Sequence, residues 1–184
     1  IFNDMDSNSI ISQIPGPTGL IEVATSSCDF NSPIRPRALL VLHPHPLYGG
    51  TMNNKVVTTL VRAGRDAGFP VVTFNFRGVG KSEGSWDGGI GELDDALAVV
   101  SAMVDLGVTE LLIAGFSFGA SIAANVVPKI EGVFSGITVR DLILVAPAVI
   151  HFPIQINTSQ NFPRIVYVND DDDVVNPAKI IDYA

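Results

Sequence analysis

The sequence predicts an α/β fold, with a mostly parallel central sheet and helices on both faces. Short, continuous apolar runs recur along the chain, as expected of strands that are covered on both faces of a parallel sheet. Segments with helical periodicity separate the first three runs, and this alternation predicts right-handed crossovers. The 184 residues, 47% of them hydrophobic and 16% charged, are suited to a single domain that spans residues 1–184.

Strands are expected at five apolar runs. These are residues 38–42, 71–76, 111–115, 142–146 and 164–168. Residues 19–27, which follow a PGPTG turn, are expected to add an edge strand. Residues 147–163 are rich in Pro, Asn and Ser, so we expect an irregular connection there. The stretch 150–162 within it is short, which predicts an open cleft with little cap.

Helices are expected over residues 53–67 and 120–127. In the first, apolar side chains line one side, and Gly68 stands where a helix end favours a residue with positive φ. The second is apolar almost all round, so it should be deeply buried. A further helix is expected to open at Asn176, with Pro177 at its first position.

The helix expected over residues 91–106 carries an apolar stripe and begins with acids. Its apolar side chains recur at steps of three and four residues, at Leu93, Leu97, Val100 and Val104. Glu92, Asp94 and Asp95 fall in the first turn, where a carboxylate interacts favourably with the helix dipole.

The composition excludes several kinds of partner. A net charge of −8 argues against nucleic acid, whose binding requires basic residues that neutralise phosphates, and leaves no polybasic patch for an anionic membrane. No apolar run reaches the roughly 20 residues that cross a bilayer, and the N-terminus lacks the pattern of a signal peptide. The single cysteine, Cys28, cannot form an internal disulfide, which favours a cytoplasmic setting.

The stretch LLIAGFSFGASIAANVV, residues 111–127, contains a Gly-x-Ser-x-Gly pentad between an apolar strand and an apolar helix. A serine on so tight a turn needs small neighbours, which Gly115 and Gly119 provide on either side of Ser117. The pattern predicts that Ser117 is a nucleophile and that the backbone N–H of Phe118 stabilises an oxyanion. The alternative is a glycine-rich turn with an incidental serine.

Four stretches, read in order, resemble a known family: HPHPLYGGTMNNKVVTTL, FNFRGVGKSEGSWDGGIGELDDALAVV, LLIAGFSFGA and LILVAPAV. They are similar to small bacterial serine hydrolases of the α/β-hydrolase superfamily, of the dienelactone-hydrolase-like type. IPGPTGLIEV is similar to the opening strands of that family, so the resemblance runs from about residue 14 to residue 177. It implies an esterase-like enzyme (EC 3.1 class) with a Ser-Asp-His triad, an oxyanion hole, no metal and no cofactor.

The loop LHPHPLYGGTMNN, residues 42–54, is expected to supply the second oxyanion donor. Proline has no N–H, so the loop offers the backbone N–H of His45, Leu47 or Tyr48, and His45 is favoured because it lies closest to the strand end. His43 is expected to hold the loop by hydrogen bonds. A metal site at His43 and His45 is the alternative, but no third ligand stands at a recognisable spacing.

The resemblance also implies an acid after the last apolar run. In RIVYVNDDDDVVNP, Asp172 matches the family's acid, with Asn169 in place of the usual glycine. Asp170, Asp171 and Asp173 are then solvated loop residues. Calcium binding by this acidic run is the alternative, but the run lacks the spaced ligands and the glycine of a calcium loop.

The base of the triad is not found in this sequence. Its three histidines, His43, His45 and His151, all precede Asp172, whereas the family's order is serine, acid, histidine. The first residue is also not methionine. We therefore expect that the natural protein is longer, that the sequence lacks the final helix and strand with the catalytic histidine, and that the chain as given is inactive.

NFRGVGKSEG could be mistaken for a phosphate-binding loop because it contains Gly-Lys-Ser. That loop requires a glycine where this sequence has Asn75. Arg77 and Ser82 are therefore expected to be structural.

Two functional hypotheses remain. The first is a serine hydrolase that cleaves a small ester, thioester or related acyl substrate, with Ser117 as nucleophile and Asp172 as the acid. The second is a non-catalytic binding or interaction protein that keeps the hydrolase fold, because fold alone does not fix function. The sequence leaves the substrate and the oligomeric state open.

Overall fold

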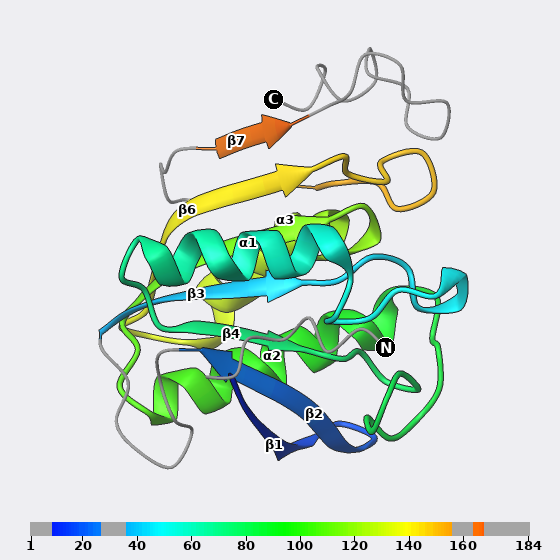
Figure 1. Ribbon diagram of the computed structural model, residues 1–184, viewed down its shortest axis with the longest axis horizontal. Coiled ribbons are helices and arrows are strands. Elements are labelled where there is room, and N and C mark those ends of the chain that lie inside the picture. Colours follow the sequence, from blue (N-terminus) through cyan, green and yellow to red (C-terminus); the bar gives the residue numbers. More distant parts are fainter. Residues whose placement is uncertain (1–8, 27–35, 156–163, 168–184) are drawn as a thin grey trace.

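The structure, a computed structural model, describes residues 9–26, 36–155 and 164–167. Its described strands form one seven-stranded sheet in the order β1-β2-β4-β3-β5-β6-β7, with helices on both faces (Figure 1). The pairs β3–β4, β3–β5, β5–β6 and β6–β7 are parallel, whereas β1–β2 and β2–β4 are antiparallel. The predicted α/β fold with a mostly parallel sheet is therefore confirmed.

The strands follow the apolar runs with shifted ends. They are β1 (Ser9–Gly16), β2 (Gly19–Ser26), β3 (Arg37–Leu42), β4 (Val71–Phe74), β5 (Glu110–Phe116), β6 (Thr138–Val145) and β7 (Arg164–Tyr167). β6 begins well before the predicted position 142, because residues 138 and 139 pair with the start of β5. β4 stops at Phe74, and the Asn75 and Phe76 that follow are buried in the turn.

The expectation that residues 19–27 form an edge strand is wrong. Their strand, β2, lies inside the sheet, because β1 pairs along its whole outer side and β4 pairs on the other. Ile10 and Ile11 of β1 are exposed, as is common on an edge strand. The sequence of β1 shows no continuous apolar run, which is why it was not predicted as a strand.

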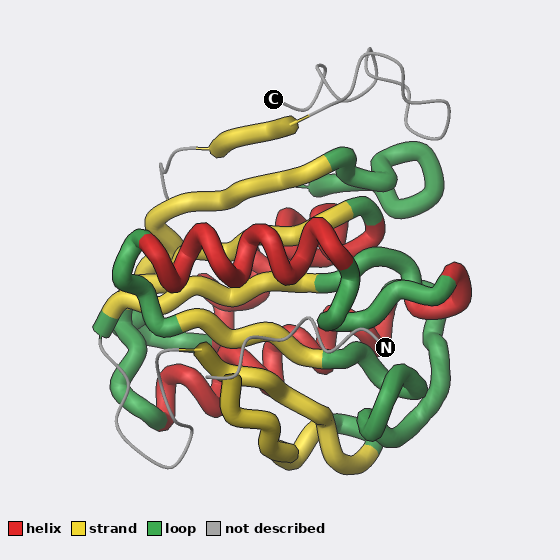
Figure 2. Tube along the Cα trace, viewed as in Figure 1, coloured by secondary structure: helices red, strands yellow, loops and turns green. Residues whose placement is uncertain are grey.

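The three α-helices are α1 (Lys55–Asp66), α2 (Ile90–Asp105) and α3 (Phe118–Val133). α1 packs on one face over Leu39, Val41 and Ala114, while α2 and α3 cover the larger core on the other face (Figure 2). α3 is longer than the predicted 120–127 and deeply buried, as expected. In α2 the fully buried side chains include Val99 and Met103, and Leu93, Leu97 and Val104 of the predicted stripe are only partly buried.

The loops that follow β3, β4, β5 and β6 lie together at one side of the molecule, because these parallel strands point the same way (Figure 1). This side carries the 3-10 turn Pro46–Tyr48 and the first turns of α2 and α3. Open α/β sheets bind ligands outside the carboxyl ends of their strands. The carboxyl edge is therefore the place to examine for a site.

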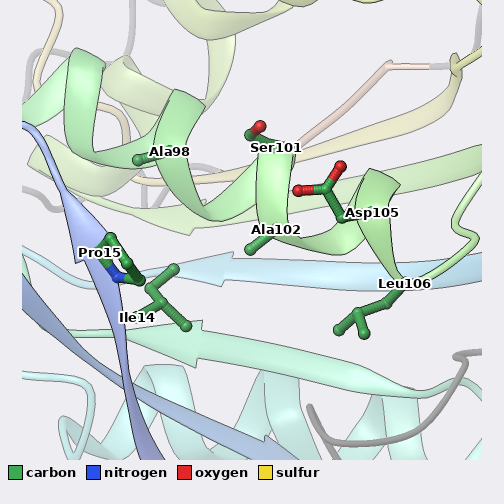
Figure 3. Close-up of a pocket in the computed structure, with 7 residues that line it drawn as sticks. All are labelled: Ile14, Pro15, Ala98, Ser101, Ala102, Asp105 and Leu106. Carbon is green, nitrogen blue, oxygen red and sulfur yellow. The ribbon is translucent and has the colours of Figure 1, made fainter.

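A pocket of about 450 Å³ lies elsewhere, between β1 and the middle and end of α2 (Figure 3). Its walls are mostly apolar, and Ser101 and Asp105 are its hydroxyl and carboxylate groups. None of its lining residues lies on the loops at the carboxyl edge, so we assign it no part in the chemistry described below. Among the described helices, none has the length and apolar character needed to cross a membrane.

Candidate active site

Ser117 lies on a sharp turn between β5 and α3. Its backbone has φ 53° and ψ −117°, a conformation that costs a non-glycine residue about 1–3 kcal/mol. The turn is held by backbone hydrogen bonds, since the N–H of Ser117 donates to Val145 O at 2.9 Å and its carbonyl accepts from Ala120 and Ala148. The predicted strand–turn–helix context of the pentad is confirmed, and Ser117 is half-buried at the carboxyl edge of the sheet.

The two glycines of the pentad are required by close backbone packing. A Cβ atom on Gly115 would lie within 3.0 Å of the backbone of Gly119 and Ala120. A Cβ atom on Gly119 would lie equally close to the backbone of Leu42 and His43, at the end of β3. Real Cβ atoms do not approach backbone so closely, so any side chain would push the serine turn away from β3 and α3.

His43 is a fully buried residue with both ring nitrogens engaged. Its Nε2 accepts a hydrogen bond from the N–H of Phe76 at 3.0 Å, and Nδ1 lies 2.6 Å from Pro44 O, to which it donates. Burial lowers the pKa of His43 to about 4, against a smaller opposing effect of the Pro44 hydrogen bond. The expectation that His43 holds the loop is confirmed, because its ring joins the loop after β3 to the end of β4.

His45 follows on the same loop, and its ring contacts that of Phe118, the residue after Ser117. Its carbonyl accepts from the N–H groups of Tyr48 and Gly50, and its Nδ1 accepts from the N–H of Leu47 at 3.2 Å. Its own N–H has no hydrogen-bond partner among the described residues. The same is true of the N–H of Phe118, the first residue of α3.

The rings of His45 and Phe118 belong to a group of five rings in contact, which we call the aromatic cluster: His45, Tyr48, Trp86, Phe118 and Phe152. The centroid of the His45 ring lies 4.3 Å from that of the Trp86 ring and 5.3 Å from that of the Phe118 ring. Desolvation lowers the pKa of His45, Glu92 opposes this, and the positive form of His151 lowers it further. The imidazole is therefore neutral at neutral pH.

The sequence did not lead us to predict a role at the site for two residues of this region, Trp86 and Glu92. Trp86, the single tryptophan of the sequence, lies in the loop after β4 and contacts both His45 and Phe118. Glu92, expected only to favour the helix dipole, is fully buried, and its two carboxylate oxygens accept from the N–H groups of Asp87 and Gly89. A lone tryptophan next to a glycine pair was the available signal for this loop.

The loop after β4 is also anchored by Arg77. Its guanidinium forms a buried ion pair with Asp95 of α2, with Nη2 and Oδ1 2.8 Å apart, and these bonds with Asp95 raise the pKa of Arg77. Ser82 donates to Asn75 O and accepts from the N–H of Glu22 on β2. The expectation that Arg77 and Ser82 are structural is therefore confirmed.

Asp172, the predicted acid, lies outside the described residues, so its position relative to Ser117 is not part of this structure. His151 is exposed in the turn after β6 and lines a pocket of about 380 Å³, together with Gly89, Ile122 and Phe152. Over residues 9–26, 36–155 and 164–167, no group of three or more His, Cys, Asp or Glu side chains is placed to hold a metal ion.

Comparison with known proteins places the chain in a family. The family model of the alpha/beta hydrolase fold matches residues 40–181. An α/β serine hydrolase without a lid from Xanthomonas campestris is 34% identical, with a TM-score of 0.80 over 97% of this chain and 79% of that one. An α/β serine hydrolase homologue from Coxiella burnetii is 38% identical, with a TM-score of 0.81 over 95% of this chain and 80% of that one.

An uncharacterized protein of Rickettsia prowazekii is 47% identical over 116 residues, which are 62% of this chain. The match spans 48% of that protein, so the chain covers about half the length of this curated relative. The family match includes the pentad, the loop after β3 and the loop after β4, which the structure brings together at the carboxyl edge. The chain therefore belongs to the α/β-hydrolase family, and its homologues include α/β serine hydrolases.

Proposed function

We propose that the protein is a serine hydrolase that cleaves a small ester, thioester or related acyl substrate. The observation that carries the proposal is the backbone of Ser117, held at φ 53° on a strand-to-helix turn that only glycines at 115 and 119 permit. Such strain persists only where the surrounding structure imposes it, and it is common at catalytic residues. In α/β hydrolases the nucleophilic serine occupies a sharp strand-to-helix turn of the same kind.

The oxyanion of the tetrahedral intermediate is proposed to bind the N–H groups of Phe118 and His45. Both donors lack a partner among the described residues, and both belong to residues whose rings are in contact. Donors that are fixed before the reaction stabilise the developing charge without reorganisation, and each is worth about 10²–10³ in kcat.

Asp172 is proposed as the acid that orients the catalytic histidine. In this family the histidine follows the acid, and the sequence given holds no histidine after Asp172. Activity is therefore to be measured on the natural gene product in its full length. We further propose a cytoplasmic enzyme that needs no cofactor, on the basis of the single cysteine and of the serine chemistry.

The test is covalent labelling of the full-length protein with a fluorophosphonate probe, followed by peptide mapping of the modified residue. We expect one adduct, on Ser117, that disappears in Ser117→Ala and persists in a matched control, Ser101→Ala on the far part of α2. Hydrolysis of a short p-nitrophenyl ester should follow the labelling. A folded protein without Ser117 labelling would favour the alternative of a binding protein with this fold.

A further inference from the structure

The indole of Trp86 bridges the two residues proposed to form the oxyanion hole. Its ring lies 4.3 Å from the His45 ring, at an interplanar angle of 37°, and 5.1 Å from the Phe118 ring in an edge contact. The rings of His45 and Phe118 are themselves 5.3 Å apart. Three segments distant in the sequence thus meet in one packed group, which includes the side chains of both proposed donor residues.

The local sequence fixes the backbone of His45 but not its position relative to α3. Pro46 restricts His45 to an extended conformation, and His45 has φ −54° and ψ 123°. The loop is further locked by the bond from Leu47 N–H to the His45 ring and by two N–H groups on the His45 carbonyl. Two contacts anchor the start of this loop, since the His43 ring accepts from the N–H of Phe76 and Gly119 packs on the backbone of Leu42 and His43. The position of His45, farther along the loop, relative to Phe118 also depends on the side chains that pack around these two residues, Trp86 among them.

Trp86 is in turn held by a buried carboxylate. Glu92, in the first turn of α2, accepts from Asp87 N–H at 2.9 Å and from Gly89 N–H at 2.7 Å. These two N–H groups belong to the first and the third residue after Trp86. Glu92 is fully buried, and removing it would leave both partly buried donors without this acceptor, at a cost of about 0.5–1.5 kcal/mol for each hydrogen bond lost.

We infer that Trp86 is a positioning residue that sets the spacing between the His45 and Phe118 N–H donors, and that Glu92 fixes Trp86 for this purpose. The inference rests on the proposed function and adds a cause for the geometry of its oxyanion hole. Trp86 contacts the side chains of the two donor residues, and neither Trp86 nor Glu92 is required to touch the reacting atoms.

The chemistry predicts a defined kinetic signature. A donor displaced by about 1 Å no longer meets the oxyanion, and misplacement of this size can cost about 100-fold in rate. Because the carbonyl of a bound substrate gains less from these donors than the oxyanion does, the loss should fall on kcat rather than on KM. If Trp86 had a purely structural role, its substitution would instead lower the amount of folded enzyme.

The test uses Trp86→Ala and Trp86→Phe in the full-length protein, with Phe69→Leu as the control. Phe69 is a partly buried aromatic residue on the α1 face, against the other core. We expect Trp86→Ala to lower kcat about 100-fold with KM changed by no more than about threefold. Trp86→Phe should recover most of the rate, and Phe69→Leu should lower the unfolding midpoint without lowering kcat.

A second measurement does not depend on activity. Trp86 fluorescence, taken as the difference from Trp86→Phe, should become more accessible to acrylamide in Glu92→Ala than in Asp94→Ala, a change of an exposed acid on the same helix turn. Equal quenching in the two variants would overturn the role of Glu92.

The failures are distinguishable. If the wild-type protein hydrolyses the ester through Ser117 and Trp86→Ala keeps a kcat within about threefold of it, the positioning role is wrong while the proposed function stands. If Ser117→Ala leaves wild-type hydrolysis unchanged, the proposed function fails and the positioning role falls with it.

Discussion

The buried imidazole of His43 should make the stability of this protein depend on pH in a predictable way. Burial lowers its pKa to about 4 in the folded state, from 6.5 in the unfolded chain. The unfolded state therefore binds the proton more tightly, and the contribution of His43 to the unfolding free energy is complete above pH 6.5. It is lost progressively as the pH falls from 6.5 to 4, below which both states are protonated.

The size of the effect follows from this separation. The difference between a pKa of 6.5 in the unfolded chain and about 4 in the folded state corresponds to about 3.4 kcal/mol of unfolding free energy. About 2 kcal/mol of this is lost between pH 7 and pH 5. Carboxylates also titrate near the lower end of this range, so wild type must be compared with a variant that lacks only this proton. His43→Gln retains an acceptor for the N–H of Phe76 and does not titrate.

The assay is urea unfolding of both proteins at pH 7 and pH 5, with His151→Gln, a change of an exposed histidine, as the control. His43→Gln should have a lower unfolding free energy than wild type at pH 7, and the difference between the two proteins should be about 2 kcal/mol smaller at pH 5. His151→Gln should show no such narrowing. If the difference in unfolding free energy between wild type and His43→Gln is the same at pH 7 and pH 5 within about 0.5 kcal/mol, the assignment of a neutral, buried His43 is refuted.

Three further substitutions test the packing around the site. Gly119→Ala places a Cβ against the backbone carbonyls of Leu42 and His43 at the end of β3, so it should cost about 1–3 kcal/mol in thermal unfolding and slow labelling by a fluorophosphonate; wild-type behaviour would contradict the close packing. Asp95→Ala removes the buried partner of the Arg77 guanidinium and leaves it only the longer pair with the exposed Asp87, whose Oδ2 lies 3.8 Å from Nη1; urea unfolding should show a loss of about 3–5 kcal/mol, whereas a loss below 1 kcal/mol would not fit. Arg37→Ala removes an exposed pair with Glu110 and should leave the unfolding midpoint unchanged; a clear drop would be unexpected.

The parts of the site that the sequence predicted are those with a local signal. The pentad combines a buried strand, a glycine-restricted turn and a helix start, and each of these can be recognised from a few consecutive residues of the sequence. His43 was predicted to be structural because a histidine with no metal or catalytic pattern around it most often is, and its two hydrogen bonds confirm this. Ser117 could be identified because its neighbours are constrained in sequence as well as in space.

The parts that were missed depend on contacts between distant segments. Nothing near Trp86 in the sequence indicates that its ring meets His45 and Phe118. Glu92 stands where a helix dipole already explains a carboxylate, so its burial and its two loop hydrogen bonds were not foreseen. β1 was missed for a related reason, since an edge strand is specified by its partner strand more than by its own pattern.

The strained turn also separates the two functional hypotheses. The conformation of Ser117 is imposed by the ends of three strands, because Gly119 packs on the end of β3, the turn leaves β5, and the Ser117 N–H is bound to Val145 of β6. A binding protein that used another surface would gain nothing from keeping a serine at φ 53°, or two donors that have no partner within the described part of the chain. Substitutions that relax such strain usually stabilise a protein, so the retention of the strain together with these two donors favours the catalytic hypothesis.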